Sequence, residues 1–131
     1  MTTDSRDKQH QITRNHSLAA AIKNSWNGIW TVIRRERNMR IHIAAALVIG
    51  IAALFDHLKP IEWLPLIAAI TLVICLEFVN TIVEALVDLI VGHHYDIKAG
   101  LAKDVAAGLV SFAVFIELLV VAIVFWSHFK G

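Results

Sequence analysis

The sequence is poor in cysteine, since Cys75 is the only one among 131 residues. A lone cysteine excludes an intramolecular disulfide and any zinc site built from several cysteines. We therefore expect Cys75 to be an unreactive, buried apolar residue. The first 16 residues also lack the apolar core of a signal peptide, so we expect neither cleavage nor secretion. Their polar composition predicts a flexible tail at 1–16.

Charge is nearly balanced, with a formal net charge of +1, and it is scarce in three long blocks. The hydrophobic fraction of 57% exceeds the ~45–50% that is typical of soluble domains. Because the excess is concentrated in these blocks, it predicts membrane spans at about 38–58, 61–90 and 103–127. The predicted fold class is an all-α membrane protein, in which residues 17–131 form a single domain.

The segment at about 17–35 predicts an amphipathic helix ahead of the first span. Ser17 is suited to cap its start. Its larger apolar residues recur at steps of three and four, so they share one helix face (Leu18, Ile22, Trp26, Ile29, Ile33). We interpret this segment as a helix that lies in the membrane interface, since a membrane span follows directly. The alternative is an ordinary surface helix of a soluble protein.

The distribution of lysine and arginine predicts the orientation of the spans. Residues 1–40 hold eight of the twelve Lys and Arg residues, and Lys98 and Lys103 follow the second span. The positive-inside rule then places the N-terminus and the region 88–104 in the cytoplasm. Within this region we expect a polar loop at 92–100, with Lys103 and Asp104 opening the third helix.

Four polar residues interrupt the end of the second apolar block: Glu77, Asn80, Glu84 and Asp88. Their steps of three, four and four place them on one helix face, which we call the polar stripe. Ionisable groups at membrane depth are costly and are usually functional. A divalent metal is the simplest reason for three carboxylates and an amide to share a face. The structural alternative is that they form inter-helix hydrogen bonds that stabilise an oligomer.

The polar stripe and its surroundings are suited to phosphoryl transfer. Mg²⁺ takes one or two carboxylates and leaves its other positions to water and phosphate, which Glu36 and Glu84 could supply. Lys103, beside Asp104, is suited to meet a phosphate. Glu77 lies deeper, where a partly desolvated carboxylate is suited to act as a general base for a lipid alcohol. Neither the P-loop nor the Gly-rich loop of protein kinases is present, so the chain matches neither common soluble type.

Glu117 and the histidines fit no clear pattern. Glu117 falls in the middle of the third block, where it could face a trimer interior, pair across subunits or form part of a proton path. A small oligomeric proton-coupled transporter, with Glu77 or Glu117 as its intramembrane proton site, is therefore the alternative from another functional class. We expect His42, His93 and His94 to be solvated or capping groups rather than metal ligands.

Three motifs resemble the signature of the prokaryotic diacylglycerol kinase family: ERNMRIH at 36–42, EFVNTIVEALVD at 77–88 and AKDVAAG at 102–108. The resemblance covers nearly the whole chain from about residue 17. The amino-acid sequences of the motifs are closer to those of the undecaprenol kinases of Gram-positive bacteria. The resemblance implies that the protein uses ATP and Mg²⁺ to phosphorylate a lipid alcohol at the cytoplasmic face of the bacterial cell membrane. Undecaprenol is the expected substrate, and diacylglycerol is the alternative.

The resemblance also implies an assembly and a set of site residues. It implies a homotrimer, with a surface helix and three membrane helices per subunit and active sites at subunit interfaces. It makes Glu77 the catalytic base and Glu36 and Glu84 the metal ligands. The implied nucleotide-binding residues are Asn24, Glu36, Asn80, Glu84, Asp88, His94, Tyr95, Asp96, Lys103 and Asp104. The implied lipid-binding residues are Asn38, Met39, Arg40, Ile41, His42 and Glu77. The family pattern E-Y-H reads His94, Tyr95 and Asp96 here, so only the tyrosine is retained.

Overall fold

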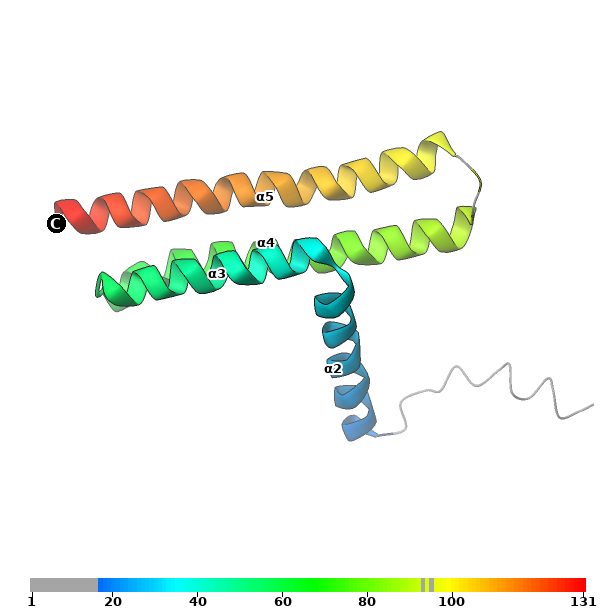
Figure 1. Cartoon of the computed structure of the whole chain (residues 1–131), viewed down its shortest axis with the longest axis horizontal. Helices are drawn as coiled ribbons and strands as arrows, with labels where there is room; N and C mark the ends of the chain where they lie inside the picture. The colour runs from blue at the N-terminus through cyan, green and yellow to red at the C-terminus, as the bar shows by residue number, and fades with distance from the viewer. Residues whose placement is uncertain (1–16, 93, 95) are drawn as a thin grey trace, which may run out of the picture. The chain divides into compact units, whose positions relative to one another are not determined.

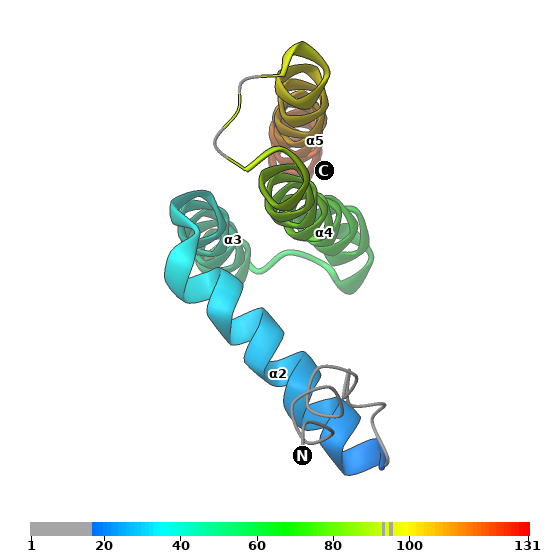
Figure 2. The same cartoon turned by 90° about the vertical axis from the view of Figure 1, so that its right-hand side faces the viewer.

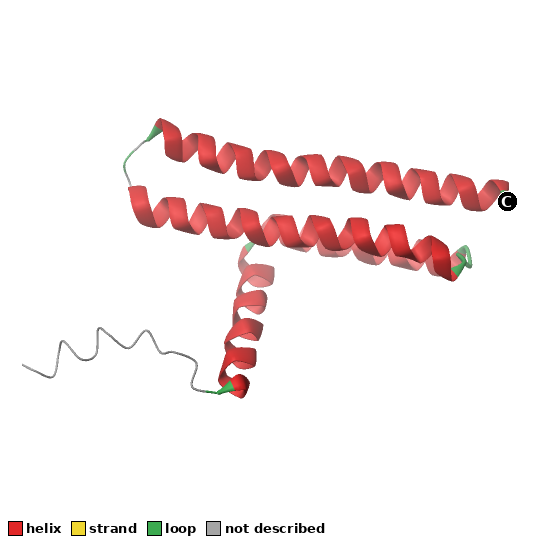
Figure 3. Cartoon of the chain, turned by 180° about the vertical axis from the view of Figure 1, so that it is seen from behind, coloured by secondary structure: helices red, strands yellow, loops and turns green. Residues whose placement is uncertain are grey.

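The computed structural model describes residues 17–92, 94 and 96–131, and the predicted tail at 1–16 lies outside these residues. The described chain forms four helices: α2 (Leu18–Arg35), α3 (Arg37–Phe55), α4 (Pro60–Val91) and α5 (Ile97–Lys130) (Figure 1). Figure 3 shows helices joined by short turns, with no strand in the described part. The prediction of an all-α fold is confirmed.

The chain divides into two compact units, one that ends at Thr31 and one that begins at Val32. In the first unit, the Ser17 hydroxyl accepts a hydrogen bond from the backbone N–H of Ala20 at 3.2 Å, so the predicted cap is confirmed. No residue of α2 is buried. Leu18, Ile22 and Trp26 expose their apolar side chains, as an interfacial helix requires. Contact of α2 with a membrane stays a prediction.

The second unit contains three helices that are long and apolar enough to cross a membrane. Their mean hydropathies are 1.8 for α3, 2.4 for α4 and 2.7 for α5, and only 11–22% of each apolar window is buried. Helices that are apolar all round yet little buried are typical of membrane spans. The prediction of three candidate spans is confirmed.

Helix α4 is the central element of this unit. It runs antiparallel to α5 and contacts α5 extensively, and it contacts α3 over a shorter stretch (Figure 2). The apolar core joins all three helices near the α3–α4 turn, through Ala53, Leu58, Leu66 and Val124. At the same end, His128 of α5 and Glu62 of α4 are 3.0 Å apart from Nδ1 to Oε2. The packed end of the unit is therefore opposite the α4–α5 loop.

Two expectations about local structure need correction. Helix α5 begins at Ile97, six residues before Lys103, because the Asp96 carboxylate caps it by accepting the backbone N–H groups of Lys98 at 2.7 Å and Ala99 at 3.0 Å. The predicted polar loop at 92–100 is correspondingly shorter. Cys75 is exposed rather than buried, because it lies two residues, roughly 200° around the helix, from the buried Glu77.

The helical conformation of α4 continues through the polar stripe to Val91. It ends at Gly92, whose φ of 58° is in the left-handed region that favours glycine at a helix C-terminus. All four polar residues of the stripe therefore remain on one regular helix, as the spacing predicted.

Candidate active site

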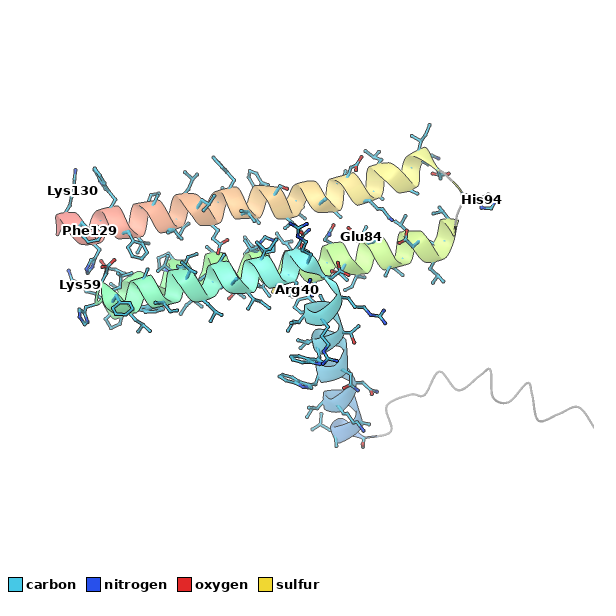
Figure 4. The ribbon with its side chains drawn as sticks, viewed as in Figure 1. Arg40, Lys59, Glu84, His94, Phe129 and Lys130 are labelled. Atoms are coloured by element: carbon cyan, nitrogen blue, oxygen red, sulfur yellow. The ribbon has the colours of Figure 1, made fainter. Side chains whose placement is uncertain are left out.

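The polar stripe of α4 is graded in burial. Glu77 and Asn80 are 1% and 5% exposed, Glu84 is half-buried and Asp88 is exposed. Helix geometry separates Glu77 from Asp88 by roughly 16 Å along the axis. Figure 4 shows Glu84 on the half of α4 that leads to His94, while Lys59 and Lys130 lie at the opposite end. One helix face thus connects a buried carboxylate with an exposed one.

Buried oxygens at the deep end of the stripe have no hydrogen-bond donor within the described chain. They are Oε2 of Glu77 and Oδ1 of Asn80. The Asn80 Nδ2 donates to Oε1 of Glu84 at 3.2 Å, which fixes the orientation of the amide. Because buried polar atoms are normally paired, two unpaired acceptors three residues apart on one helix face indicate a place for a donor from a ligand.

The residues that carry these two acceptors, Glu77 and Asn80, line a cavity of about 350 Å³, which we call the deep pocket. This volume is within the range of small-molecule sites, roughly 300–1,000 Å³. All three membrane helices contribute to its lining: Asn38 and His42 from α3, Glu77 and Asn80 from α4, and Ala107, Val110, Ser111 and Val114 from α5. The deep pocket combines an apolar α5 wall with a polar α4 wall, which suits an amphipathic ligand.

Glu36 joins the site from the junction between α2 and α3. It is the residue before α3, half-buried, and its side chain makes no capping hydrogen bond to that helix. Its charge and that of Glu84 both act on Glu77. Glu36 and Glu84 line neither the deep pocket nor the cavity at the α4–α5 loop, so this electrostatic interaction is what links the two proposed metal ligands to Glu77.

The carboxylates of Glu36 and Glu84 fit a magnesium ion that is shared with a phosphate ligand. No cluster of three or more His, Cys, Asp or Glu residues suited to a metal occurs among residues 17–92, 94 and 96–131. Mg²⁺ needs no such cluster, because one or two carboxylates suffice when substrate phosphates and water complete the shell. The donor set is thus compatible with Mg²⁺ bound together with ATP.

A second cavity, of about 340 Å³, lies where α4 and α5 meet the loop between them, and we call it the loop pocket. The Lys103 Nζ lies 2.5 Å from Asp88 Oδ1 in an ion pair that bridges α5 and α4. Asp88, His94, Asp96 and Lys103 all line this pocket. Four of the predicted nucleotide residues therefore lie at one end of the stripe, and one of them, Lys103, could meet a phosphate.

The other predicted site residues have different positions. Asp104 is exposed and does not line the loop pocket, Asn24 belongs to the unit that ends at Thr31, and Tyr95 lies outside the described residues. Of the predicted lipid contacts on α3, only Asn38 and His42 line the deep pocket.

The remaining α3 residues do not reach the deep pocket. Met39 is fully buried, and Ile41 is 52% exposed. The Arg40 Nη1 donates to the Arg34 carbonyl at 2.8 Å, so this side chain caps a backbone carbonyl in the last turn of α2. Asn38 and His42, four residues apart, therefore share the helix face that lines the pocket.

The sequence analysis missed the α5 wall of the deep pocket and the Glu62–His128 pair. Ser111 and its neighbours lie in an apolar run, and only the steps of three and four between Ala107, Ser111 and Val114 indicate a shared face. Glu62 and His128 are 66 residues apart, so no local pattern connects them.

Comparison with known proteins identifies the family. The family model for prokaryotic diacylglycerol kinase matches residues 23–125. A protein named diacylglycerol kinase from Synechocystis sp. is 36% identical over 104 residues, which cover 79% of this chain and 59% of that relative. Proteins of the same name from Escherichia coli strain K12 and Shigella flexneri are each 31% identical over 105 residues, which cover 80% of this chain and 85% of each relative.

This chain therefore spans less than two thirds of the length of the Synechocystis relative. The family match nevertheless includes α3, α4 and both pockets, together with most of α2 and α5. The apolar helices and the family match together indicate an integral membrane protein. Because the family model covers well over half of the chain, the chain belongs to the prokaryotic diacylglycerol kinase family.

Proposed function

We propose that this protein is a lipid kinase that transfers the terminal phosphoryl group of ATP to a lipid alcohol at the membrane surface. The observation that carries the proposal is the buried carboxylate of Glu77, whose Oε2 has no donor within the described chain, in a residue that lines the deep pocket. A hydroxyl group is the donor that such an acceptor lacks. The family membership of the chain supports the same activity.

In the proposed reaction, the lipid hydroxyl oxygen attacks the terminal phosphorus of ATP. The O–H proton passes to the Glu77 carboxylate, a new P–O bond forms to the lipid, and the P–O bond to ADP breaks. Asn80 orients the Glu84 carboxylate by donating a hydrogen bond to it. Because phosphoryl transfer depends mainly on positioning and electrostatics, the graded burial of α4 is suited to it: the acceptor lies deep and the nucleotide lies at the surface.

Glu36 and Glu84 are the proposed ligands of Mg²⁺, which neutralises phosphate charge when it is bound. Lys103 is the proposed phosphate contact, and its ion pair with Asp88 positions the ammonium group at the loop pocket. Asp96 also caps α5, so a cap and a nucleotide contact are both roles to test for this residue. Asp104 and Asn24 keep their proposed nucleotide roles, although neither lines the loop pocket.

Two lipid alcohols are candidate acceptors. The residues of the sequence motifs favour undecaprenol as the acceptor, whereas the relatives that match this chain are named diacylglycerol kinase. We propose a long-chain lipid alcohol as the substrate class and treat these two lipids as the acceptors to compare. The family assignment favours either kinase over the proton-coupled transporter. The proposed assembly is a homotrimer in the cytoplasmic membrane, with the N-terminus in the cytoplasm.

The test is an assay with purified protein, labelled ATP, Mg²⁺ and a panel of undecaprenol, 1,2-diacylglycerol and ceramide in detergent micelles. The proposal predicts label in an organic-soluble phospholipid that depends on Mg²⁺ and on one or more of the offered alcohols. A reaction with no added lipid is the control for contaminating kinases. Absence of labelled lipid from every acceptor, in a folded and ATP-saturated sample, would reject the proposal.

A further inference from the structure

Gly100 lines the loop pocket, and the proposed reaction gives it no role. It lies in the first turn of α5 and is half-buried. Its backbone is helical, since its N–H donates to the Asp96 carbonyl at 3.0 Å and its φ is not positive. Glycine is less stable than alanine at such a position. The conformation of the backbone therefore gives no reason for a glycine at position 100.

The packing of the helices gives no reason either. Glycine in a membrane helix often allows a second helix to approach closely. A Cβ added to Gly100, however, would meet no atom of another described element within 4 Å. Asp96 and Lys103, four residues before and three residues after Gly100, also line the loop pocket, so the space is on the pocket side of α5.

The middle of the loop pocket is apolar and has little side-chain bulk on its α5 wall. Ala99 and Gly100 form this part of the wall, and Val87 and Val91 of α4 line the same pocket. The bulky side chains at the start of α5 are exposed and do not line the pocket: Ile97 and Leu101 are 75% and 61% exposed. An occupant of the pocket thus meets apolar surface between charged residues.

The order of residues along the two helices orients a nucleotide in this pocket. Lys103, the proposed phosphate contact, pairs with Asp88, and the proposed metal ligand Glu84 is one turn deeper on α4. The terminal phosphate of ATP must point in that direction, because the acceptor lies deeper still. Gly100 is three residues from Lys103 on the other side, toward the loop, at roughly 4.5 Å along the axis. The nucleoside of ATP then lies at Gly100.

We propose that Gly100 is a specificity-determining residue of the loop pocket, because its missing side chain leaves the space that the nucleoside of ATP fills. The inference rests on the proposed function, in which ATP is the phosphoryl donor. A nucleoside has a planar base with apolar faces, which suits a wall formed by Ala99 and Gly100. A larger side chain at position 100 excludes the nucleoside, whereas a bare phosphate chain still reaches Lys103.

The experiment measures the binding of ATP and of inorganic tripolyphosphate, each with Mg²⁺, to the full chain in detergent without lipid. Tripolyphosphate has three linked phosphates, as ATP does, but no nucleoside. Gly100→Leu is expected to weaken ATP binding about tenfold, as overfilling a packed site does, and to leave tripolyphosphate binding within twofold of wild type. Gly100→Ala is expected to weaken ATP binding less and to preserve or raise the melting temperature, because alanine favours helices.

Two further variants make the comparison specific. Gly108→Ala is the matched control, because Gly108 is also on α5, has open space around it and lines neither pocket. Its affinities for both ligands are expected to equal those of wild type. Lys103→Met is expected to weaken both ligands, since it removes a phosphate contact and leaves the nucleoside space unchanged. Isothermal titration calorimetry measures the affinities, and thermal unfolding shows whether each variant is folded.

Unchanged ATP binding in Gly100→Leu would overturn the proposal, and so would equal losses for both ligands. A lower melting temperature together with equal losses would show that position 100 packs against another subunit. The proposed function fails in a different way. A wild-type protein that binds ATP but phosphorylates no lipid would reject the kinase activity, while the selective loss of ATP binding in Gly100→Leu would still be expected.

Discussion

The residues of α4 show how one helix can give similar side chains different chemistry. Glu77 and Glu84 are both glutamates, two turns apart on the same face. Glu77 is buried with an unpaired oxygen, whereas Glu84 is half-buried and accepts a hydrogen bond from Asn80. Because desolvation favours a base and partial exposure favours a metal shared with phosphate, depth along the helix separates the two proposed roles.

At the residue scale, substitution of Lys103 is expected to affect catalysis much more than stability. The ion pair of Lys103 with Asp88 has side-chain exposures of 37% and 63%, and solvent screening makes such exposed pairs contribute little to stability. Lys103→Met is therefore expected to change the melting temperature little. It is expected to lower kcat by roughly 10²–10³-fold, as the loss of one donor to a transition-state charge does.

The measurement pairs a kinase assay with thermal unfolding in detergent. Lys98→Met is the matched control, because Lys98 is an exposed lysine near the start of α5 and does not line the loop pocket. If Lys103→Met unfolds at a much lower temperature but retains its kcat, the ion pair is structural and the phosphate role is wrong.

The sequence predicted the polar stripe but not all of the residues that complete it. Steps of three, four and four on one helix determine that Glu77, Asn80, Glu84 and Asp88 share a face, whatever the helix packs against. Whether Arg40 or His42 faces a pocket depends on how α3 rotates against α4, which is decided by tertiary packing. The motif stretch around them could therefore be recognised, while its division into packing and pocket residues could not.

At the scale of elements, the two ends of the three-helix unit are stabilised differently. The end near the α3–α4 turn has the apolar core and the Glu62–His128 hydrogen bond. The end near the α4–α5 loop has the polar stripe, the Lys103–Asp88 pair and the two pockets. Stability and chemistry are thus assigned to opposite ends of the same helices.

This separation predicts that His128→Ala lowers stability without slowing phosphoryl transfer. His128 and Glu62 have side-chain exposures of 18% and 14%, and leaving one partner of a largely covered pair without its hydrogen bond is destabilising. Glu62 is roughly 22 Å along α4 from Glu77, so kcat is expected to remain near wild type. Urea or thermal unfolding measures the loss, and a large fall in kcat at temperatures where the variant is folded would contradict the separation.

The start of α5 makes a second prediction at this scale, because Asp96 has two competing interpretations. The structure assigns it a cap, through hydrogen bonds to the N–H groups of Lys98 and Ala99. Asparagine caps helices about as well as aspartate, whereas alanine costs about 1 kcal/mol. Asp96→Asn is therefore expected to retain stability and KM for ATP, and Asp96→Ala to lose stability. A raised KM for ATP in Asp96→Asn would favour a direct nucleotide contact.

Helix type was predictable from the sequence, and helix ends were less so. The three apolar blocks are long and almost free of charge, so helical spans at α3, α4 and α5 could be predicted from composition. The start of α5 depended on whether Asp96 turned its carboxylate toward the following N–H groups, a choice that the polar residues of the loop left open. The pairing of Glu62 with His128 required the antiparallel register of α4 and α5, which no local pattern encodes.

At the scale of the whole molecule, a single chain leaves most of its apolar surface uncovered. The apolar windows of the three spans are 11–22% buried, and large residues such as Leu47, Phe112 and Ile123 are exposed. Lipid covers such surface well, and so do further subunits. The proposed homotrimer and the proposed cytoplasmic N-terminus both belong to this scale, and both remain predictions.

The trimer is tested by mass and by activity together. Native mass spectrometry from detergent is expected to give three times the 14.6 kDa mass of the chain. Lipid kinase activity is expected to decline in proportion to the trimer as detergent dilutes the subunits. A fully active monomer would show that one chain forms a complete site.

The central claim is that the buried carboxylate of Glu77 accepts the proton of a lipid hydroxyl during phosphoryl transfer. The most direct measurement is the single-turnover rate of label transfer from ATP to lipid in Glu77→Gln, which keeps the size of the side chain but cannot take the proton. Cys75→Ser, at an exposed position on the same helix, is the control. The account predicts a loss of at least about 10²-fold in a variant with unchanged folding and ATP binding. A Glu77→Gln variant that transfers phosphate at the wild-type rate would contradict it.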